Sequence, residues 1–78
     1  MKLKELLDST YCDCRIELHS AYDGRLVAST RDSLEKYGEV TVKKIRPLIK
    51  VNKEGTFANP YIYVYASAYE INEVKKNG

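Results

Sequence analysis

The stretch YCDCRIELH, residues 11–19, alternates strictly between two kinds of side chain, and no other feature constrains the fold as strongly. On one side of an extended chain would lie Cys12, Cys14, Ile16 and Leu18. On the other would lie Tyr11, Asp13, Arg15, Glu17 and His19. A repeat of two residues is typical of a strand with one buried face. The sequence therefore predicts a half-buried β-strand here.

A second alternating stretch, YIYVYASAY at residues 61–69, carries four of the chain's seven tyrosines. Aliphatic or small residues separate these tyrosines, which are Tyr61, Tyr63, Tyr65 and Tyr69. Successive side chains of a strand point to opposite faces of a sheet. We therefore expect a last strand over this stretch, with its tyrosines on the face that points away from the core.

Shorter signals predict the remaining elements. Leucines at helical spacing indicate a short N-terminal helix, and Asp23-Gly24 indicates a hairpin turn before a short strand. The segment STRDSLEKYG favours a brief helix, with Ser29 or Thr30 as its N-cap and Gly38 at its end. Residues 39–51 are rich in β-branched side chains, but Pro47 removes a backbone donor. We expect that strand to be interrupted, bulged or at an edge of the sheet.

These elements predict an α+β fold with two layers and the order helix, strand, strand, helix, strand, strand. The expected sheet has four mostly antiparallel strands, with two short helices on one face. We expect a single domain over residues 1–72 and a frayed C-terminal tail over residues 73–78. The expected core gathers Leu3, Leu6, Leu7, Cys12, Cys14, Ile16, Leu18, Leu34, Ile45, Ile49, Val51, Ile62 and Val64.

Composition and charge narrow the choice of partners. No apolar run approaches the roughly 20 residues of a membrane helix, and the N-terminus lacks a signal-type segment, so we expect a cytoplasmic protein without membrane contact. The net charge is only +2, with −2 in residues 1–39 and +4 in residues 40–78. Five basic and no acidic residues lie between Val40 and Lys53. This is a local basic stretch, not the strongly basic whole typical of nucleic-acid binders.

The candidate binding surface is the outer face of the predicted sheet. Period-two alternation brings Lys44, Arg46 and Lys50 to the same face as Tyr61, Tyr63, Tyr65 and Tyr69. Such a face can bind a protein partner, or stack a base while the cations contact phosphate. It can also mediate self-association, or be an ordinary solvated strand surface. Phe57, in the loop NKEGTFANP, is a second candidate binding residue.

Catalysis, cofactors and metals are not expected. Cys12 and Cys14 share the phase of Ile16, which favours buried, reduced thiols. Two cysteines and one histidine fall short of the four ligands of a structural zinc site. The sequence has no glycine-rich phosphate-binding motif. His19 has Ser20 and Asp23 nearby in sequence, but spacing alone does not supply a catalytic triad.

The segments MKLKELLDST, RLVASTRDSLEKYG, EVTVKKIRP and YIYVYAS occur in a characteristic order. This layout resembles small uncharacterised proteins carried by phages and mobile elements of Gram-positive gut bacteria, over residues 1 to about 67. The resemblance implies an accessory protein that acts by binding. Its partner would be a protein, such as a host defence complex that it inhibits in the manner of an anti-CRISPR protein, or a signal nucleotide that it sequesters. We also expect a homodimer, because a small core leaves an aromatic face open.

Overall fold

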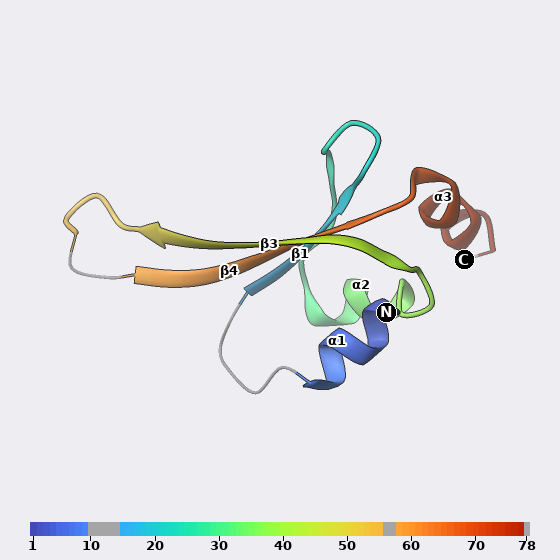
Figure 1. The fold of residues 1–78 in the computed structure, drawn as a ribbon, viewed down its shortest axis with the longest axis horizontal. Coiled ribbons are helices and arrows are strands. Elements are labelled where there is room, and N and C mark those ends of the chain that lie inside the picture. Colours follow the sequence, from blue (N-terminus) through green and yellow to red (C-terminus); the bar gives the residue numbers. More distant parts are fainter. Residues whose placement is uncertain (10–14, 56–57, 78) are drawn as a thin grey trace.

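The computed structural model describes residues 1–9, 15–55 and 58–77. Within these ranges the chain forms three helices and four strands (Figure 1). In chain order they are α1 (Leu3–Ser9), β1 (Arg15–Ser20), β2 (Leu26–Ala28), α2 (Arg31–Lys36), β3 (Val42–Val51), β4 (Ala58–Ala66) and α3 (Ala68–Asn77). The molecule measures 43 × 26 × 20 Å, and the β3–β4 hairpin projects along its longest direction (Figure 1).

The described strands form one mixed sheet in the order β2-β1-β4-β3. The outer pairs β1–β2 and β3–β4 are antiparallel, whereas the central pair β1–β4 is parallel. Strands β2 and β3 consequently run in the same direction, and α2 with its flanking turns carries the chain back beneath the sheet between them. The α+β class expected from the sequence is confirmed. The sheet is mixed, however, and a third helix is present.

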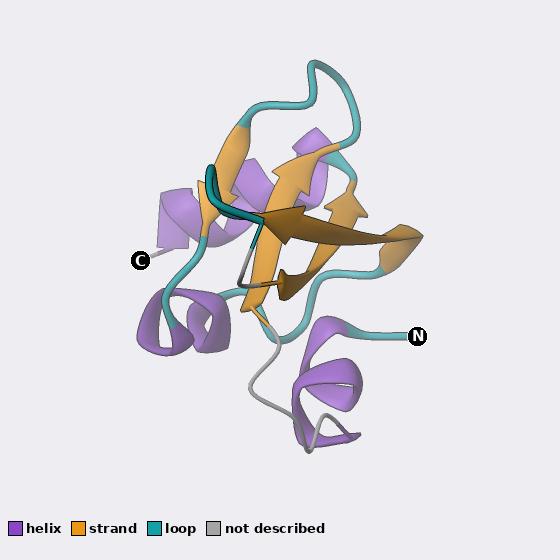
Figure 2. Ribbon diagram, turned by 90° about the vertical axis from the view of Figure 1, so that its left-hand side faces the viewer, coloured by secondary structure: helices purple, strands orange, loops and turns teal. Residues whose placement is uncertain are grey.

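The core lies between one face of the sheet and the helices. Figure 2 shows α1 and α2 below the strands and α3 behind them. The buried apolar residues are Leu3, Leu7, Ile16, Leu18, Ala28, Leu34, Tyr37, Val40, Val64, Ala66 and Ile71. Two residues expected in the core, Leu6 and Ile62, are partly buried against it. Cys12 and Cys14 lie outside the described residues.

Three residues assigned to the core from sequence are exposed, and that assignment was wrong. Ile45, Ile49 and Val51 keep 43%, 72% and 58% of their surface accessible. They do lie on the helix side of the sheet, because Ile45 pairs with the fully buried Val64 in the β3–β4 register. Helices α1 and α2 lie under only one end of this long hairpin (Figure 1). The far end, residues 47–51 and 58–61, extends beyond this helical layer and is called the hairpin arm below.

Backbone hydrogen bonds fix the N-terminal segment and α1 against the turn that precedes β3. The N–H of Leu3 donates to Val40 O at 3.0 Å, and the N–H of Lys4 donates to Gly38 O at 2.9 Å. A Cβ at Gly38 would lie 3.2 Å from Lys4 Cβ, so a glycine here permits the close approach of α1.

Hydrogen bonds from Lys2 and Lys4 to Glu39 lower the pKa of that exposed carboxyl to about 2.

Helix α3 replaces the end of the last predicted strand. Strand β4 ends at Ala66, and Ser67 then caps the helix, because its Oγ accepts the Tyr69 N–H at 3.2 Å. Ile71, buried to 2% exposure, anchors the helix on the core. The Glu70 carboxylate accepts the Thr41 N–H and hydroxyl, which ties α3 to the start of β3. The strand expected up to residue 69 was therefore wrong, and residues 73–77 belong to the same helix.

We expect Ser67→Ala to lower the free energy of unfolding by about 1 kcal/mol, because the first turn of α3 loses its side-chain acceptor. Ser67→Asp keeps an acceptor at the N-cap and should retain most of the stability. Urea denaturation of the three proteins, followed by circular dichroism, makes the comparison. Equal stability of the alanine variant and the parent would contradict the capping role.

Candidate binding face of the sheet

Strand register gathers the predicted site residues on the sheet face opposite α1 and α2. Across the sheet, Lys44 pairs with Tyr65, Arg46 with Tyr63 and Leu48 with Tyr61. On the other side of β4, the same tyrosines pair with His19, Glu17 and Arg15. Paired residues present their side chains on one face. This surface is called the tyrosine face, and it consists of Arg15, Glu17, His19, Lys44, Arg46, Leu48, Lys50, Tyr61, Tyr63 and Tyr65.

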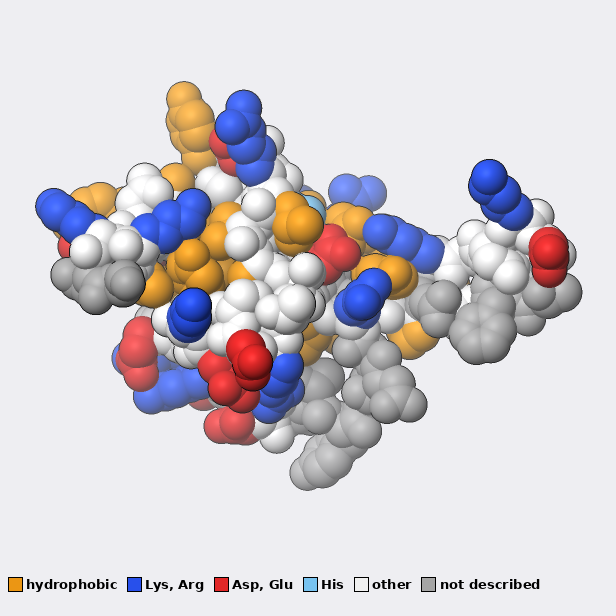
Figure 3. All heavy atoms as spheres, turned by 180° about the vertical axis from the view of Figure 1, so that it is seen from behind, with side chains coloured by type: hydrophobic (Ala, Val, Ile, Leu, Met, Phe, Trp, Pro, Cys, Tyr) orange, Lys and Arg blue, Asp and Glu red, His pale blue; other side chains and the backbone are white. Residues whose placement is uncertain are grey.

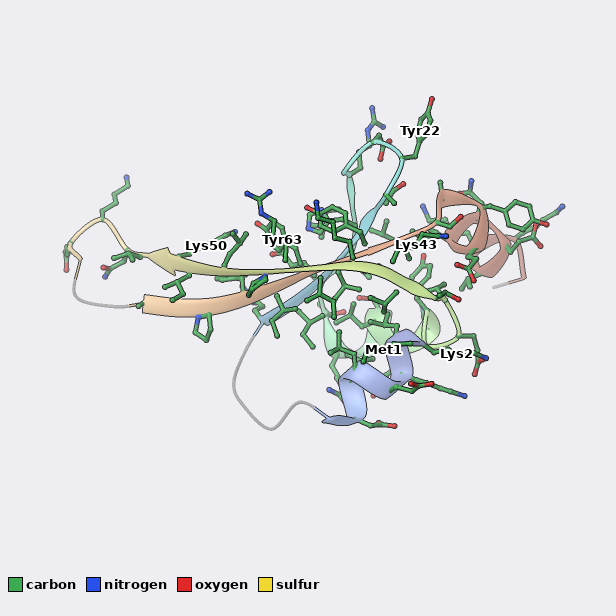
Figure 4. All side chains as sticks on the ribbon, in the orientation of Figure 1. Met1, Lys2, Tyr22, Lys43, Lys50 and Tyr63 are labelled. Carbon is green, nitrogen blue, oxygen red and sulfur yellow. The ribbon has the colours of Figure 1, made fainter. Side chains whose placement is uncertain are left out.

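Lysine ammonium groups lie against the tyrosine rings. Lys50 Nζ is 4.3 Å from the ring centroid of Tyr61 and 5.4 Å from that of Tyr63. Lys44 Nζ is 5.9 Å from the centroid of Tyr65. Each distance falls within the range of a cation–π interaction. Figure 4 shows Lys50 and Tyr63 on the side of the sheet away from α1.

Hydrogen bonding to Tyr63 raises the pKa of Lys50 above its usual 10.5, and the charge of Glu17 adds to the effect. Lys50 is therefore cationic at neutral pH. Arg15, Lys44 and Arg46 are exposed beside it, whereas Tyr61, Tyr63 and Tyr65 are half-buried. Among the described residues of this face, Glu17 is the single acid. The face thus combines an aromatic row with a cationic border, and Figure 3 shows basic side chains along the projecting hairpin.

His19 supports the tyrosine row from β1. It is 9% exposed, and its ring centroid lies 4.5 Å from that of Tyr63 and 5.6 Å from that of Tyr65. Its Nδ1 lies 3.0 Å from Gly24 O, and must donate because a carbonyl oxygen only accepts. Its Nε2 lies 3.1 Å from Glu17 Oε1. The imidazole is therefore held through Nδ1, with Nε2 beside the Glu17 carboxylate, and presents a fixed surface to the two tyrosines.

Alternation in the sequence predicted that His19 lies on this face, but it did not predict that His19 positions the tyrosines. Two signals were available, namely its alternation in phase with Glu17 and the Asp23-Gly24 turn that brings a carbonyl back to it. Tyr69 does not join the row, because it lies on α3 and is 73% exposed. Its assignment to this face was wrong. Phe57 lies outside the described residues.

The groups considered for a catalytic triad have separate partners. His19 contacts Gly24 and Glu17, and Ser20 Oγ accepts the Tyr22 N–H at 3.2 Å. Asp23 accepts the Arg25 N–H at 3.0 Å. In the part of the chain that the structure describes, no three His, Cys, Asp or Glu side chains are grouped so as to hold a metal ion.

Comparison with protein families, with curated proteins and with solved structures finds no match. No helix within the described ranges is both long enough and apolar enough to span a membrane. The tyrosine face and the strands that build it are therefore the basis on which function is inferred.

We expect His19→Ala to lower the free energy of unfolding by about 1–3 kcal/mol, because it leaves Gly24 O and the Glu17 carboxylate without their partner. His19→Asn keeps a donor near the position of Nδ1 and should recover part of the loss. Chemical denaturation measures the stability. Amide shifts of Gly24 and Tyr63 report whether the ring contact is lost. An alanine variant with unchanged stability and unchanged Tyr63 shifts would refute the anchoring role.

Proposed function

We propose that this protein is a small non-enzymatic binding module that holds a protein partner on its tyrosine face. The observation that carries the proposal is the fixed packing of the aromatic row, with His19 on one side and Lys50 on the other. Tyrosine offers a large amphipathic contact area with little conformational freedom to lose. A surface that is already ordered loses less entropy when a partner binds.

The charge of the face indicates an acidic partner surface. Lys44, Arg46 and Lys50 border the tyrosines along β3, and Arg15 adds a further positive charge from β1. Glu17, whose Oε1 lies 3.1 Å from His19 Nε2, is the single described acid among these four basic residues. Complementary charges speed association and select among partners, while buried tyrosine and arginine anchors supply most of the affinity.

A nucleotide or nucleic acid is the alternative ligand of the same face, favoured by tyrosines beside cations. Two features favour a protein partner over this alternative ligand. The rings of Tyr61 and Tyr63 already contact Lys50, and those of Tyr63 and Tyr65 contact His19, so a stacking base would have to displace internal contacts. Glu17 also places a carboxylate within the row, where it opposes phosphate.

The biological context is part of the proposal and comes from the sequence layout alone. A resemblance to phage and mobile-element proteins favours a cytoplasmic accessory factor that inhibits a host defence complex. Direct binding through a preformed surface is consistent with that role, because an inhibitor of this kind needs no reaction chemistry.

The homodimer expected from the sequence stays a prediction. The exposed apolar side chains of the hairpin arm, Ile49 and Val51, are a surface that a second copy would cover. Light scattering at high micromolar concentration should then give twice the mass of the 9.0 kDa chain. A mass of one chain under these conditions would rule the dimer out.

We expect Tyr63→Ala and Tyr65→Ala each to weaken binding of a purified protein partner by about thirtyfold, as truncation of a central anchor does. Tyr22→Ala and Tyr69→Ala are matched controls, because these tyrosines are 88% and 73% exposed elsewhere on the molecule, and they should leave affinity unchanged. Calorimetry with a partner identified by affinity capture gives the dissociation constants of the four variants.

The same four variants should be titrated against labelled single-stranded RNA and DNA at several salt concentrations. The protein-binding proposal expects weak binding that does not depend on Tyr63. Tight, strongly salt-dependent binding that Tyr63→Ala abolishes would instead assign the face to nucleic acid.

A further inference from the structure

Strand β3 is an edge strand of the described sheet: it pairs with β4, and the N-terminal segment meets its outer edge only at the start, where the Val42 N–H donates to Met1 O at 2.8 Å. It is 10 residues long, and beyond Val42 its backbone groups on the outer side have no neighbouring strand among the described residues. Such an edge can pair with a further extended segment. What it accepts depends on which backbone groups point outward and on which side chains flank them.

Two prolines identify the outward-pointing backbone groups. In an antiparallel ladder, directly opposed residues alternate between pairs that exchange two hydrogen bonds and pairs that exchange none. Pro47 opposes Ile62 and Pro60 opposes Ile49, so both prolines fall on the same alternate set of pairs. A proline has no N–H to give, and this set is therefore the one without hydrogen bonds. The N–H and C=O groups of Ile45, Ile49 and Val51 consequently point to the open edge.

The side chains of β3 divide by the same alternation. Ile45, Ile49 and Val51 lie on the helix side and are exposed. Lys44, Arg46 and Lys50 lie on the tyrosine side. A strand added to this edge would thus have an apolar neighbour row on one face and a cationic row on the other. Acidic residues alternating with apolar residues complement both rows at once.

Charge argues against a second copy of β3 as the occupant. If two copies paired in an antiparallel manner about Pro47, Lys44 of one copy would oppose Lys50 of the other. Like charges directly opposed across strands are destabilising, and lysines on edge strands are a common protection against self-pairing. The five basic residues without an acid between Val40 and Lys53 favour an acidic segment instead.

We propose that the open edge of β3 accepts an extended segment of a partner protein, with alternating acidic and apolar residues, as an additional strand of the sheet. This inference rests on the proposed function, since it describes how a protein partner would meet the sheet. The segment's backbone would bond to the outward groups of Ile45 and Ile49. Its acidic side chains would lie beside Lys44, Arg46 and Lys50.

The probe for this site is a capped peptide of alternating glutamate and valine, titrated into isotopically labelled protein and followed by amide resonances. We expect saturable shifts centred on the amides of Ile45, Ile49 and Val51, together with slower hydrogen exchange at these amides. N-methylation of alternate peptide nitrogens removes the donors of one peptide edge. It should weaken binding by at least about tenfold while the protein is left unaltered.

Ile49→Pro is the matching protein variant, because it removes an outward donor without removing a bond to β4. It should weaken peptide binding by about tenfold, provided that the circular dichroism of the variant matches that of the parent. A peptide with the same composition but with its glutamates and valines in two blocks is the control for charge alone, and it should bind weakly.

Other outcomes would overturn the edge proposal. No saturable binding at about millimolar peptide would refute it while Tyr63-dependent binding of a protein partner stands. Shifts confined to the tyrosine face would likewise leave the proposed function and remove the edge site. Edge amides that are already protected in a dimer would assign the edge to a second copy. If oligothymidylate bound at the same amides more tightly than the peptide, the edge would be assigned to nucleic acid.

Discussion

The parallel pairing of β1 with β4 is the constraint on which the rest of the structure depends. It sets Leu18 opposite Val64, and both side chains are completely buried. The same register sets His19 opposite Tyr65 on the other face. Because side chains alternate, a slip of one residue would expose the apolar pair and bury the polar one. Burial of one face thus also fixes the composition of the other, and the tyrosine face is a direct consequence of the core.

The second determinant is the difference in length between the sheet and the helices that cover it. Helices α1 and α2 have seven and six residues, whereas β3 has 10. Short helices cannot cover a long hairpin, and a chain of 78 residues buries only about 60% of its unfolded surface. The hairpin arm therefore carries apolar side chains that the core does not use. The apolar side chains of the arm and the tyrosine face lie on opposite sides of one ladder.

Sequence alternation predicted which residues share a face but not how deeply each one is buried. The positions of Tyr61, Tyr63, Lys44 and Arg46 follow from a period of two, which is a local property of the chain. Burial of Ile49 depends instead on whether a helix lies beneath it. That is decided by the lengths and connections of distant elements, and no local pattern encodes them. The parallel pairing of β1 with β4 could not be predicted from the sequence for the same reason.

The missed helix α3 has a local explanation. Ser67 and Glu70 form the spacing of a helix N-terminus, but Ala66 and Ala68 also continue the alternation of β4. Alanine is small enough for either pattern, so the two signals overlap. The alternation is the longer of the two, and it predicts a strand. In the structure, the Ser67 cap and the buried Ile71 favour the helix. Tyr69 consequently leaves the row that its spacing from Tyr65 had indicated.

The two proposed contact surfaces share one set of cations, and this makes them parts of a single surface. Lys44, Arg46 and Lys50 border the tyrosines on one side and the open edge on the other. Their own backbone groups point toward β4, while those of Ile45 and Ile49 point outward. A strand added at this edge would extend the tyrosine face by one row. Its acidic side chains would neutralise the lysines and arginine without displacing Lys50 from the rings of Tyr61 and Tyr63. A base stacked on those rings would have to displace it.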